Sequence, residues 1–392
     1  MMMRRLRVAG VSLALLVLAL VAASAQAGAA KPRSSKAIQT AKPIWTLAMD
    51  GPRVAYMRTD RRVGVWNTAT GATSVIKGNY PSNGRSFGYG TGEVAIAGKR
   101  VALITRFEIG NTMQTEERLY TAPLGGTAHQ LGKRTDHSSD PGDCSELPGS
   151  GYADGNWLGG LVGSGKVLAV SSWKADGATT TEEQLSLITP TALTKIASGP
   201  GAIVSQWADA GHIAVLRSTD AWPAYQGPLE QSTPLVGIYS AGGTLRGEVA
   251  LAPLPDFCGY PFAFVRIALS GNRLVVLRLE LPRAGSVTAT VEVYDWTTGA
   301  LVHTWPLALS HVAPIEDRLF VSGRIAVIEG AFRLRLLDLT TGKAATVAAT
   351  RPNNPATIGP RGLVYAVNPT KDSGAGKLVF VPTTKLLAAL GK

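Results

Sequence analysis

The chain has 392 residues, of which 45% are hydrophobic and 17% are charged. This composition is too apolar for an intrinsically disordered protein and is sufficient for a large buried core. The formal net charge of +12 comes without any dense lysine and arginine run carrying interleaved aromatic residues, so we expect no nucleic-acid binding. The positive charge instead favours contact with anionic envelope polymers or lipid.

Residues 1–27 have the features of a secretory signal peptide. A positive start with Arg4 and Arg5 precedes an almost wholly apolar run over residues 8–21, and small-x-small cleavage patterns follow up to Ala27. The apolar run is short for a membrane-spanning helix, and an uncleaved anchor is the alternative. We therefore expect the mature protein to be secreted, periplasmic or associated with the cell envelope, with no transmembrane segment after cleavage.

Residues 28–43 are polar and are expected to form a flexible leader, and residues 44–392 a single domain. At the start of this domain, short runs rich in β-branched and aromatic residues alternate with turn residues. The first predicted strands are Ile44–Ala48, Arg53–Met57, Val63–Trp66 and Thr73–Ile76. This region has no helical periodicity, so a strand-rich unit with tight turns is expected.

Two kinds of turn recur along the domain. The inner turn is a glycine followed by a small or basic residue and then by apolar residues. Its copies begin at Gly51, Gly98, Gly165, Gly211, Gly271, Gly323 and Gly362. The outer turn closes a hairpin, with copies at 65–71, 120–125, 187–191, 239–243, 294–299, 337–342 and, in degenerate form, 380–384. Spacings of roughly 40 to 65 residues predict four-stranded units arranged radially, with a solenoid as the competing interpretation.

These repeats resemble those of the WD-repeat-like and TolB-like β-propellers of bacterial envelopes, over about residues 44–390. The resemblance concerns the fold, because these families are defined by their blades rather than by catalytic residues. It implies an all-β protein, a seven-bladed β-propeller of four-stranded antiparallel blades. The outermost strand of the last blade would come either from the C-terminal tail, residues 385–390, or from residues 37–40.

The connections between the predicted strands fall into two classes of different length. In a four-stranded blade, the first-to-second and third-to-fourth turns lie on one face, and the second-to-third and inter-blade connections lie on the other. The first class is short throughout. The second class holds the long loops, at 79–92, 106–118, 134–156, 173–184, 218–234 and 250–262. Because long loops on a rigid scaffold usually carry binding residues, we expect a ligand on this face around the central channel.

Aromatic and cationic side chains in two of these loops are candidates for ligand contact. They are Tyr80, Arg85 and Tyr89 in one loop and Trp222 and Tyr225 in the other. Amphipathic aromatic rings at loop tips fit glycan or peptide contact. The alternative is that each ring packs under its own loop.

The densest polar cluster offers Asp136, His137, Asp140 and Asp143 as metal ligands. Carboxylates with one imidazole suit Ca²⁺ or a transition metal. Their spacing matches no calcium loop, and the alternative is a solvated loop rich in Asx turns.

The two cysteines, Cys144 and Cys258, both fall in predicted inter-blade loops. In an exported protein, a disulfide is the simplest interpretation, with two separate thiols as the alternative. Closing a loop of this length would stabilise the fold by about 4–5 kcal/mol in the chain-entropy model.

The sequence contains no convincing catalytic constellation. We therefore expect a monomeric, exported, non-catalytic binding propeller of the cell envelope that uses no cofactor, with an envelope protein or a cell-surface polymer as its partner. The alternative is a propeller enzyme, a glycan lyase or hydrolase with or without a metal ion, whose acid and base groups meet at the channel mouth. Converging carboxylates or histidines on the long-loop face would mark this alternative.

Overall fold

The computed structural model describes residues 36–78, 92–108, 114–138, 153–176, 179–199, 202–218, 234–252, 265–280, 288–308, 318–330, 333–349, 354–370 and 374–391. The chain divides into two units, Met1–Ser35 and Lys36–Lys392, and every described element belongs to the second. The described elements are strands β1 to β28 and the short helix α2. Among the described residues, no helix has the length and hydrophobicity needed to cross a bilayer.

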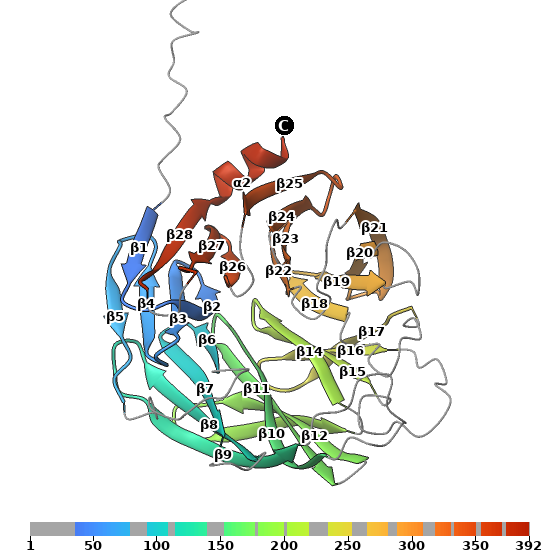
Figure 1. Cartoon of the computed structure of the whole chain (residues 1–392). Coiled ribbons are helices and arrows are strands. Elements are labelled where there is room, and N and C mark those ends of the chain that lie inside the picture. Colours follow the sequence, from blue (N-terminus) through green and yellow to red (C-terminus); the bar gives the residue numbers. More distant parts are fainter. Residues whose placement is uncertain are drawn as a thin grey trace, which may run out of the picture. The chain divides into compact units, whose positions relative to one another are not determined.

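The strands form seven four-stranded antiparallel blades around a centre, and the first strand of each blade is innermost (Figure 1). Blade 1 consists of β2 (Ile44–Asp50), β3 (Arg53–Arg58), β4 (Val63–Asn67) and β5 (Thr73–Val75). Blade 2 consists of β6 (Glu93–Ala97), β7 (Arg100–Glu108), β8 (Gln114–Pro123) and β9 (His129–Ser138). Blade 3 consists of β10 (Ala153–Ser164), β11 (Val167–Asp176), β12 (Thr179–Ile188) and β13 (Leu193–Gly199). Blade 4 consists of β14 (Ala202–Asp209), β15 (His212–Ser218), β16 (Leu235–Ser240) and β17 (Leu245–Ala250).

Three further blades complete the ring. Blade 5 consists of β18 (Val265–Ser270), β19 (Arg273–Glu280), β20 (Thr288–Asp295) and β21 (Ala300–Ala308). Blade 6 consists of β22 (Arg318–Ser322), β23 (Ile325–Gly330), β24 (Arg333–Asp338) and β25 (Ala344–Ala349). Blade 7 consists of β26 (Ala356–Gly359), β27 (Gly362–Val367), β28 (Gly376–Pro382) and β1 (Lys36–Thr40). The predicted fold class is thereby confirmed, as is the fold-level resemblance to WD-repeat-like and TolB-like propellers.

The hydrophobic core lies between blades. The inner strands of each blade place apolar residues toward both neighbouring blades, so every blade buries apolar residues on both of its faces. Buried side chains form a separate cluster at each of the seven blade interfaces, from blade 1 against blade 2 round to blade 7 against blade 1. Trp66, 1% exposed, fills the interface between blades 7 and 1, as expected for a tryptophan used in inter-blade packing.

The N-terminal strand closes the ring, which answers the question that the sequence left open. β1 pairs with β28 in an antiparallel register from Lys36 opposite Phe380 to Thr40 opposite Gly376. The side chain of Asn368 holds both backbone groups of Ile44, accepting from its N–H at 2.8 Å and donating to its carbonyl at 2.7 Å. The domain therefore begins at Lys36, within the segment 28–43 that the sequence analysis assigns to a flexible leader.

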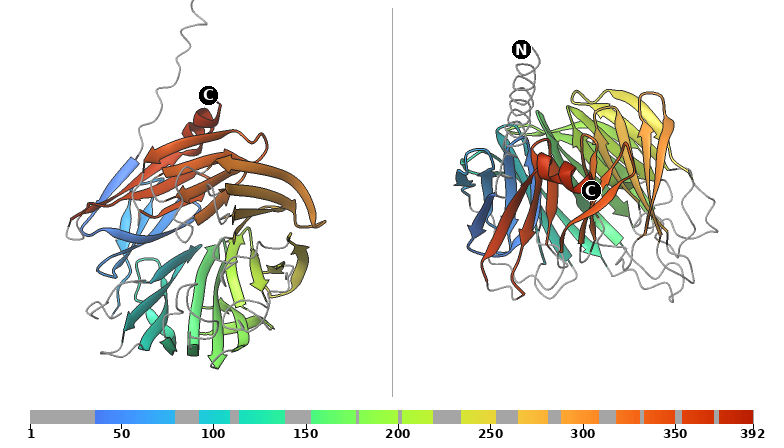
Figure 2. Two further views of the ribbon diagram at one scale, coloured as in Figure 1. Left: turned by 45° about the vertical axis from the view of Figure 1, so that its right-hand side comes forward. Right: turned by 90° about the horizontal axis from the view of Figure 1, so that it is seen from above.

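The C-terminal tail does not form the predicted seventh outer hairpin. Helix α2 (Thr383–Leu390) follows β28 directly, because Leu, Ala and Lys are strong helix formers. Leu386 and Leu390, one turn apart, are buried against blades 6 and 7. Figure 2 shows α2 and the blades from two further directions.

The strands reach further into the predicted long loops than expected. β9 continues to Ser138 and β10 begins at Ala153, and these two strands pair across blades 2 and 3. β7 and β8 likewise replace most of the predicted loop 106–118. The reason is that polar residues take strand positions when partners are supplied, as Arg118 and Lys133 of the same blade do for Glu116, and Arg106 together with the Leu158 N–H of blade 3 does for Glu117.

Candidate functional site

Most of the sequence-predicted site residues lie outside the described part of the chain. This applies to Tyr80, Arg85, Tyr89, Asp140, Asp143, Cys144, Trp222, Tyr225 and Cys258. The backbones of Asp136 and His137 lie in strand β9, opposite Gly155 and Asp154, rather than in the predicted loop. Within the described ranges, no group of three or more His, Cys, Asp or Glu side chains is placed to hold a metal ion. The ligand, metal and disulfide assignments therefore stay predictions.

A central channel cavity of about 720 Å³ is lined by the innermost strands of all seven blades. Its two ends differ because each innermost strand runs from a long connection to a short turn. We name these the long-connection end and the short-turn end. Glu93, Arg266 and Arg318 stand at the long-connection end, at the first or second position of β6, β18 and β22. Asp50 and Asp209 close β2 and β14 at the short-turn end.

Two aromatic side chains narrow one side of the cavity. The rings of Trp207 in β14 and Phe320 in β22 meet edge to face, with centroids 5.9 Å apart and planes at 64°. These strands belong to blades 4 and 6, so the two rings meet in front of blade 5 between them. Such pairs stabilise packing and present an apolar surface to whatever enters the cavity.

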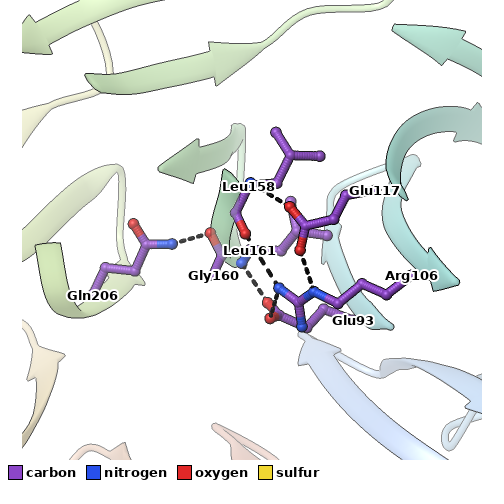
Figure 3. Close-up of polar contacts among 7 residues, drawn as sticks. All are labelled: Glu93, Arg106, Glu117, Leu158, Gly160, Leu161 and Gln206. Atoms are coloured by element: carbon purple, nitrogen blue, oxygen red, sulfur yellow. Dashed lines mark hydrogen bonds and ion pairs between the residues drawn. The ribbon is translucent and has the colours of Figure 1, made fainter. Parts of the chain in front are cut away.

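A bulge in β10 on the cavity wall organises a charged cluster. The register of β10 against β11 shifts between Leu158 and Leu161, so backbone groups there leave the regular ladder. Charged and amide side chains from neighbouring blades take up these groups (Figure 3). The Leu158 N–H donates to Glu117, and the Leu161 N–H donates to Glu93 at 2.7 Å. The Gln206 amide donates to the Gly160 carbonyl from the opposite side.

Arg106 joins the two carboxylates of this cluster. Its Nε donates to Glu117 Oε1 at 2.5 Å, and its Nη2 donates to Glu93 Oε1 at 3.2 Å and to the Leu158 carbonyl at 3.2 Å. Every carboxylate oxygen of Glu93 and Glu117 therefore accepts a hydrogen bond from within the protein. This arrangement satisfies a buried polar network and braces the bulge between blades 2, 3 and 4.

Burial and ion pairing oppose each other in this cluster. Burial lowers the pKa of the Arg106 guanidinium, but Glu93 and Glu117 outweigh burial and raise that pKa above its ordinary value. Burial raises the pKa of the Glu117 carboxyl, and Arg106 counteracts only part of the increase. The cluster thus holds two carboxylates around one permanent cation on the wall of the channel.

Two further arginines face the cavity from adjacent blades. Arg318, an exposed residue, opens β22. Arg266 in β18 donates from Nη1 to the Val265 carbonyl at 3.0 Å and also lines the cavity. Together with Trp207 and Phe320, which lie deeper in the channel, they give the cavity a cationic and aromatic lining on the side of blades 4 to 6.

The sequence analysis missed these residues for an identifiable reason. It placed Arg106 and Glu117 in a loop, whereas they are direct partners in the β7–β8 register. The double glycine at Gly159–Gly160, inside an otherwise regular strand, was the available signal for a bulge. Arg266 and Arg318 follow connections whose lengths the sequence left undefined, so nothing marked them as neighbours.

Comparisons with known proteins identify no family for this chain. No family model and no curated protein matches the sequence. Many solved structures are similar to it, including the following three. The computationally designed protein Ika8 has a TM-score of 0.40 and 11% identity, over 88% of this chain and 98% of that chain. BamB from Moraxella catarrhalis has a TM-score of 0.39 and 10% identity, over 86% of this chain and 85% of that chain. Saccharomyces cerevisiae Sqt1 has a TM-score of 0.39 and 9% identity, over 90% of this chain and 100% of that chain. These values say nothing of function.

Proposed function

We propose that this chain is an exported binding propeller of the cell envelope that receives an anionic segment of an envelope protein or cell-surface polymer at the long-connection end of its channel. One observation carries the proposal. Arg266 and Arg318, on adjacent inner strands, line one cavity beside the Trp207–Phe320 pair. Concave sites that combine aromatic surface with a few convergent polar groups are the usual form of a ligand site.

The charges lining the cavity support an anionic ligand at this end. Glu93, the carboxylate lining the long-connection end, is already bound by Arg106 and by the Leu161 N–H. The carboxylates of Asp50 and Asp209 lie at the other end and accept backbone N–H groups of the inner turns. Arginine suits this role because its planar guanidinium binds carboxylate and phosphate in a fixed geometry.

The predicted loop residues extend the proposed site outward. Tyr80, Arg85, Tyr89, Trp222 and Tyr225 belong to connections that start from the long-connection end of blades 1 and 4. In this proposal they contact the part of the partner that stays outside the channel. A disulfide between Cys144 and Cys258 would hold two inter-blade connections together at this end, and it requires the export that the N-terminal segment predicts.

A loop-trimming experiment tests the proposal. Because β9 ends at Ser138 and β10 begins at Ala153, residues 139–152 can be replaced by a short Gly-Asn linker while the β9–β10 pairing stays intact. Tagged wild-type protein and the trimmed variant are used to capture partners from an envelope extract. We expect a partner that is released by salt and lost from both the trimmed variant and an Arg266→Gln/Arg318→Gln variant.

The matched control carries the same number of charge changes at the short-turn end, Lys99→Gln with Lys166→Gln, and should retain the partner. Capture that is indifferent to both the trimming and the arginine changes would contradict the proposal.

A propeller enzyme is the second candidate, because Glu93 and Glu117 converge on one guanidinium at the channel wall. The raised pKa of the Glu117 carboxyl would suit a general acid. All four carboxylate oxygens of Glu93 and Glu117 accept hydrogen bonds from the protein. This argues against general acid–base catalysis and for a structural role in stabilising the bulge. Turnover of an acidic oligosaccharide panel by the wild type, abolished by Glu117→Gln in a variant that still folds, would favour the enzyme.

A further inference from the structure

We propose that the short-turn face docks on a membrane surface rich in anionic phospholipid, so that the long-connection end points away from the bilayer. The observation behind this is a ring of basic residues in the inner turns, one turn per blade. Six of the seven inner turns carry lysine or arginine at or next to the turn, and blade 4 carries His212. The ring residues are Arg53, Lys99, Arg100, Lys166, Arg273, Arg324 and Arg361.

Four of the seven ring cations are exposed at the surface. Lys99, Lys166 and Arg361 are exposed, as is Lys343 in the outer turn of blade 6. Arg324 pairs with Asp338 at 3.4 Å while its side chain stays 51% exposed. Two other ring arginines are half-buried and are held by turn carbonyls. Arg53 donates to Gly98 and Arg100 donates to Ile188, each at 3.0 Å.

The two carboxylates that line the channel at this end accept hydrogen bonds from backbone N–H groups. Asp50 accepts from the Gly98 N–H at 2.6 Å and from the Gly165 N–H at 2.9 Å. Asp209 accepts from the Gly271 N–H at 2.9 Å. Both line the channel, whereas the ring cations surround its mouth. The short-turn end therefore has an acidic centre and a mainly basic periphery, in which Asp338 pairs with Arg324 and Asp295 accepts hydrogen bonds from Asn272 and Thr297. This periphery meets a flat partner first.

The shape of this face favours a flat partner over a linear one. Its turns are two residues long between the first and second strands and, in blades 1 to 6, at most five residues long between the third and fourth, while in blade 7 helix α2 follows the third strand at this end. Such turns form no groove for a single polymer chain, and the cations are spread around a ring rather than along a track. A bilayer with anionic headgroups presents charge over a plane, and each lysine or arginine near it contributes attraction that salt screens.

Exposed apolar side chains beside the outer turns favour lipid over a soluble polyanion. Leu245 opens β17 and is 44% exposed, and Leu301 is the second residue of β21 and is 52% exposed. Trp296 lies in the turn before β21, where its indole N–H donates to the Gly271 carbonyl at 2.9 Å. Apolar and indole groups next to cations suit the boundary between headgroups and acyl chains.

Vesicle sedimentation tests the proposal, using phosphatidylcholine vesicles with about 30% phosphatidylglycerol against pure phosphatidylcholine. The full chain and residues 36–392, which contain every described strand, are tested in parallel. The shorter chain removes any contribution of the apolar N-terminal run. We expect both to bind the anionic vesicles and to be released as salt rises from about 50 mM to about 500 mM.

Two triple variants locate the binding. Lys99→Gln/Lys166→Gln/Arg361→Gln should weaken vesicle binding about a hundredfold, at roughly tenfold or less per charge. Lys42→Gln/Arg62→Gln/Lys377→Gln removes three exposed charges at the long-connection end and should leave binding within about twofold. Equal loss in both variants, or no binding of the wild type to anionic vesicles, overturns the proposal. Thermal unfolding checks that both variants fold.

A third variant separates lipid from other polyanions. Leu245→Ser/Leu301→Ser should weaken vesicle binding severalfold without changing binding to polyglutamate or to a short RNA duplex. If this variant binds vesicles like the wild type, and the ring variant loses the soluble polyanions as strongly as the vesicles, the surface is a general polyanion site and the membrane proposal fails. Partner capture at the long-connection end is unaffected by either result, so the two proposals fail independently.

Discussion

Two buried glutamates in adjacent blades have opposite surroundings. Glu117 in β8 is 3% exposed, and both of its oxygens accept hydrogen bonds, from Arg106 and from the Leu158 N–H. Glu183 in β12 is fully buried, and among the described residues neither of its oxygens has a hydrogen-bond partner. Arg217 of blade 4 influences Glu183 electrostatically, but its Nε and Nη2 likewise find no partner in the described part of the chain.

The difference comes from the backbone rather than from the side chains. The β10 bulge frees N–H groups that Glu117 can accept from, whereas Glu183 stands opposite Trp173 and Gly199 in regular pairings. Burial raises the pKa of the Glu183 carboxyl to about 9, and Arg217 lowers it only in part. At neutral pH Glu183 is therefore protonated, while the Glu117 cluster holds an ion pair. A glutamate near an arginine thus forms a stabilising ion pair in blade 2, whereas in blade 3 it is a buried, protonated carboxyl without a hydrogen-bond partner among the described residues.

The largest effect is expected from removing the cation of the satisfied cluster. Arg106→Ala leaves Glu93 and Glu117 facing each other without a counter-charge, and should lower the free energy of unfolding by about 3–5 kcal/mol. Urea denaturation at neutral pH measures this. Arg318→Ala, at the same end of the channel but exposed, is the control and should change stability by less than about 0.5 kcal/mol. Equal effects of the two substitutions would show that the cluster is no brace.

Glu183→Gln is expected to increase the free energy of unfolding, whereas Arg106→Ala decreases it. The unfolded chain ionises this carboxyl near its ordinary pKa of 4.5, and the folded chain only near 9, so folding takes up a proton between these values. Stability should fall as the pH rises through this window. Glutamine removes the titration, and should raise stability at neutral pH by about 2–3 kcal/mol and flatten the pH profile.

Glu116→Gln is a control for this pH profile, because folding lowers the pKa of Glu116 and raises that of Glu183. Burial opposes ionisation of Glu116, but Lys133 and Arg118 outweigh it and hold the pKa of its carboxyl below the ordinary value. Its contribution to stability is present above the unfolded pKa and is lost as the pH falls through the folded one. A Glu183→Gln variant with an unchanged slope above pH 4.5 would contradict the prediction, because the wild-type carboxyl would then not be the group that takes up a proton on folding.

The contrast also shows what the sequence could reveal. The recurring glycine turns predicted seven blades, because backbone conformation with positive φ is a local property that glycine marks, as at Gly98 and Gly271 with φ of +56° and +60°. The sequence left two candidates for the strand that closes the ring and could not decide between them, because residues 36–40 meet β28 only across the whole length of the domain. The packing of α2 against blade 6 is also non-local, because blade 6 ends at Ala349 and α2 begins at Thr383.

The channel site was harder to predict than the blades. Arg106 and Glu117 belong to one hairpin, but their partners Glu93 and Leu158 come from different strands and blades. Sequence spacing carries no information on such convergence. The same holds for Glu183 and Arg217, whose proximity depends on how blades 3 and 4 pack. The ring of basic turn residues was visible as a repeated pattern, but its placement on one face needed the strand directions.

The smallest change in the free energy of unfolding is expected from Gly160→Ala, which tests the β10 bulge. A Cβ added at Gly160 would lie 3.0 Å from Gln206 Nε2, so Gly160→Ala must shift the amide that binds the Gly160 carbonyl. We expect a loss of about 1 kcal/mol in the free energy of unfolding. Gly132→Ala in β9 is the control, because its new Cβ would meet only Leu193 Cδ1 at 4.0 Å. In a Gln206→Ala background the cost of Gly160→Ala should shrink, since the crowded amide is gone. A cost that stays the same in both backgrounds would assign it to the backbone of the bulge, and the bracing would then rest on Arg106 and its two carboxylates alone.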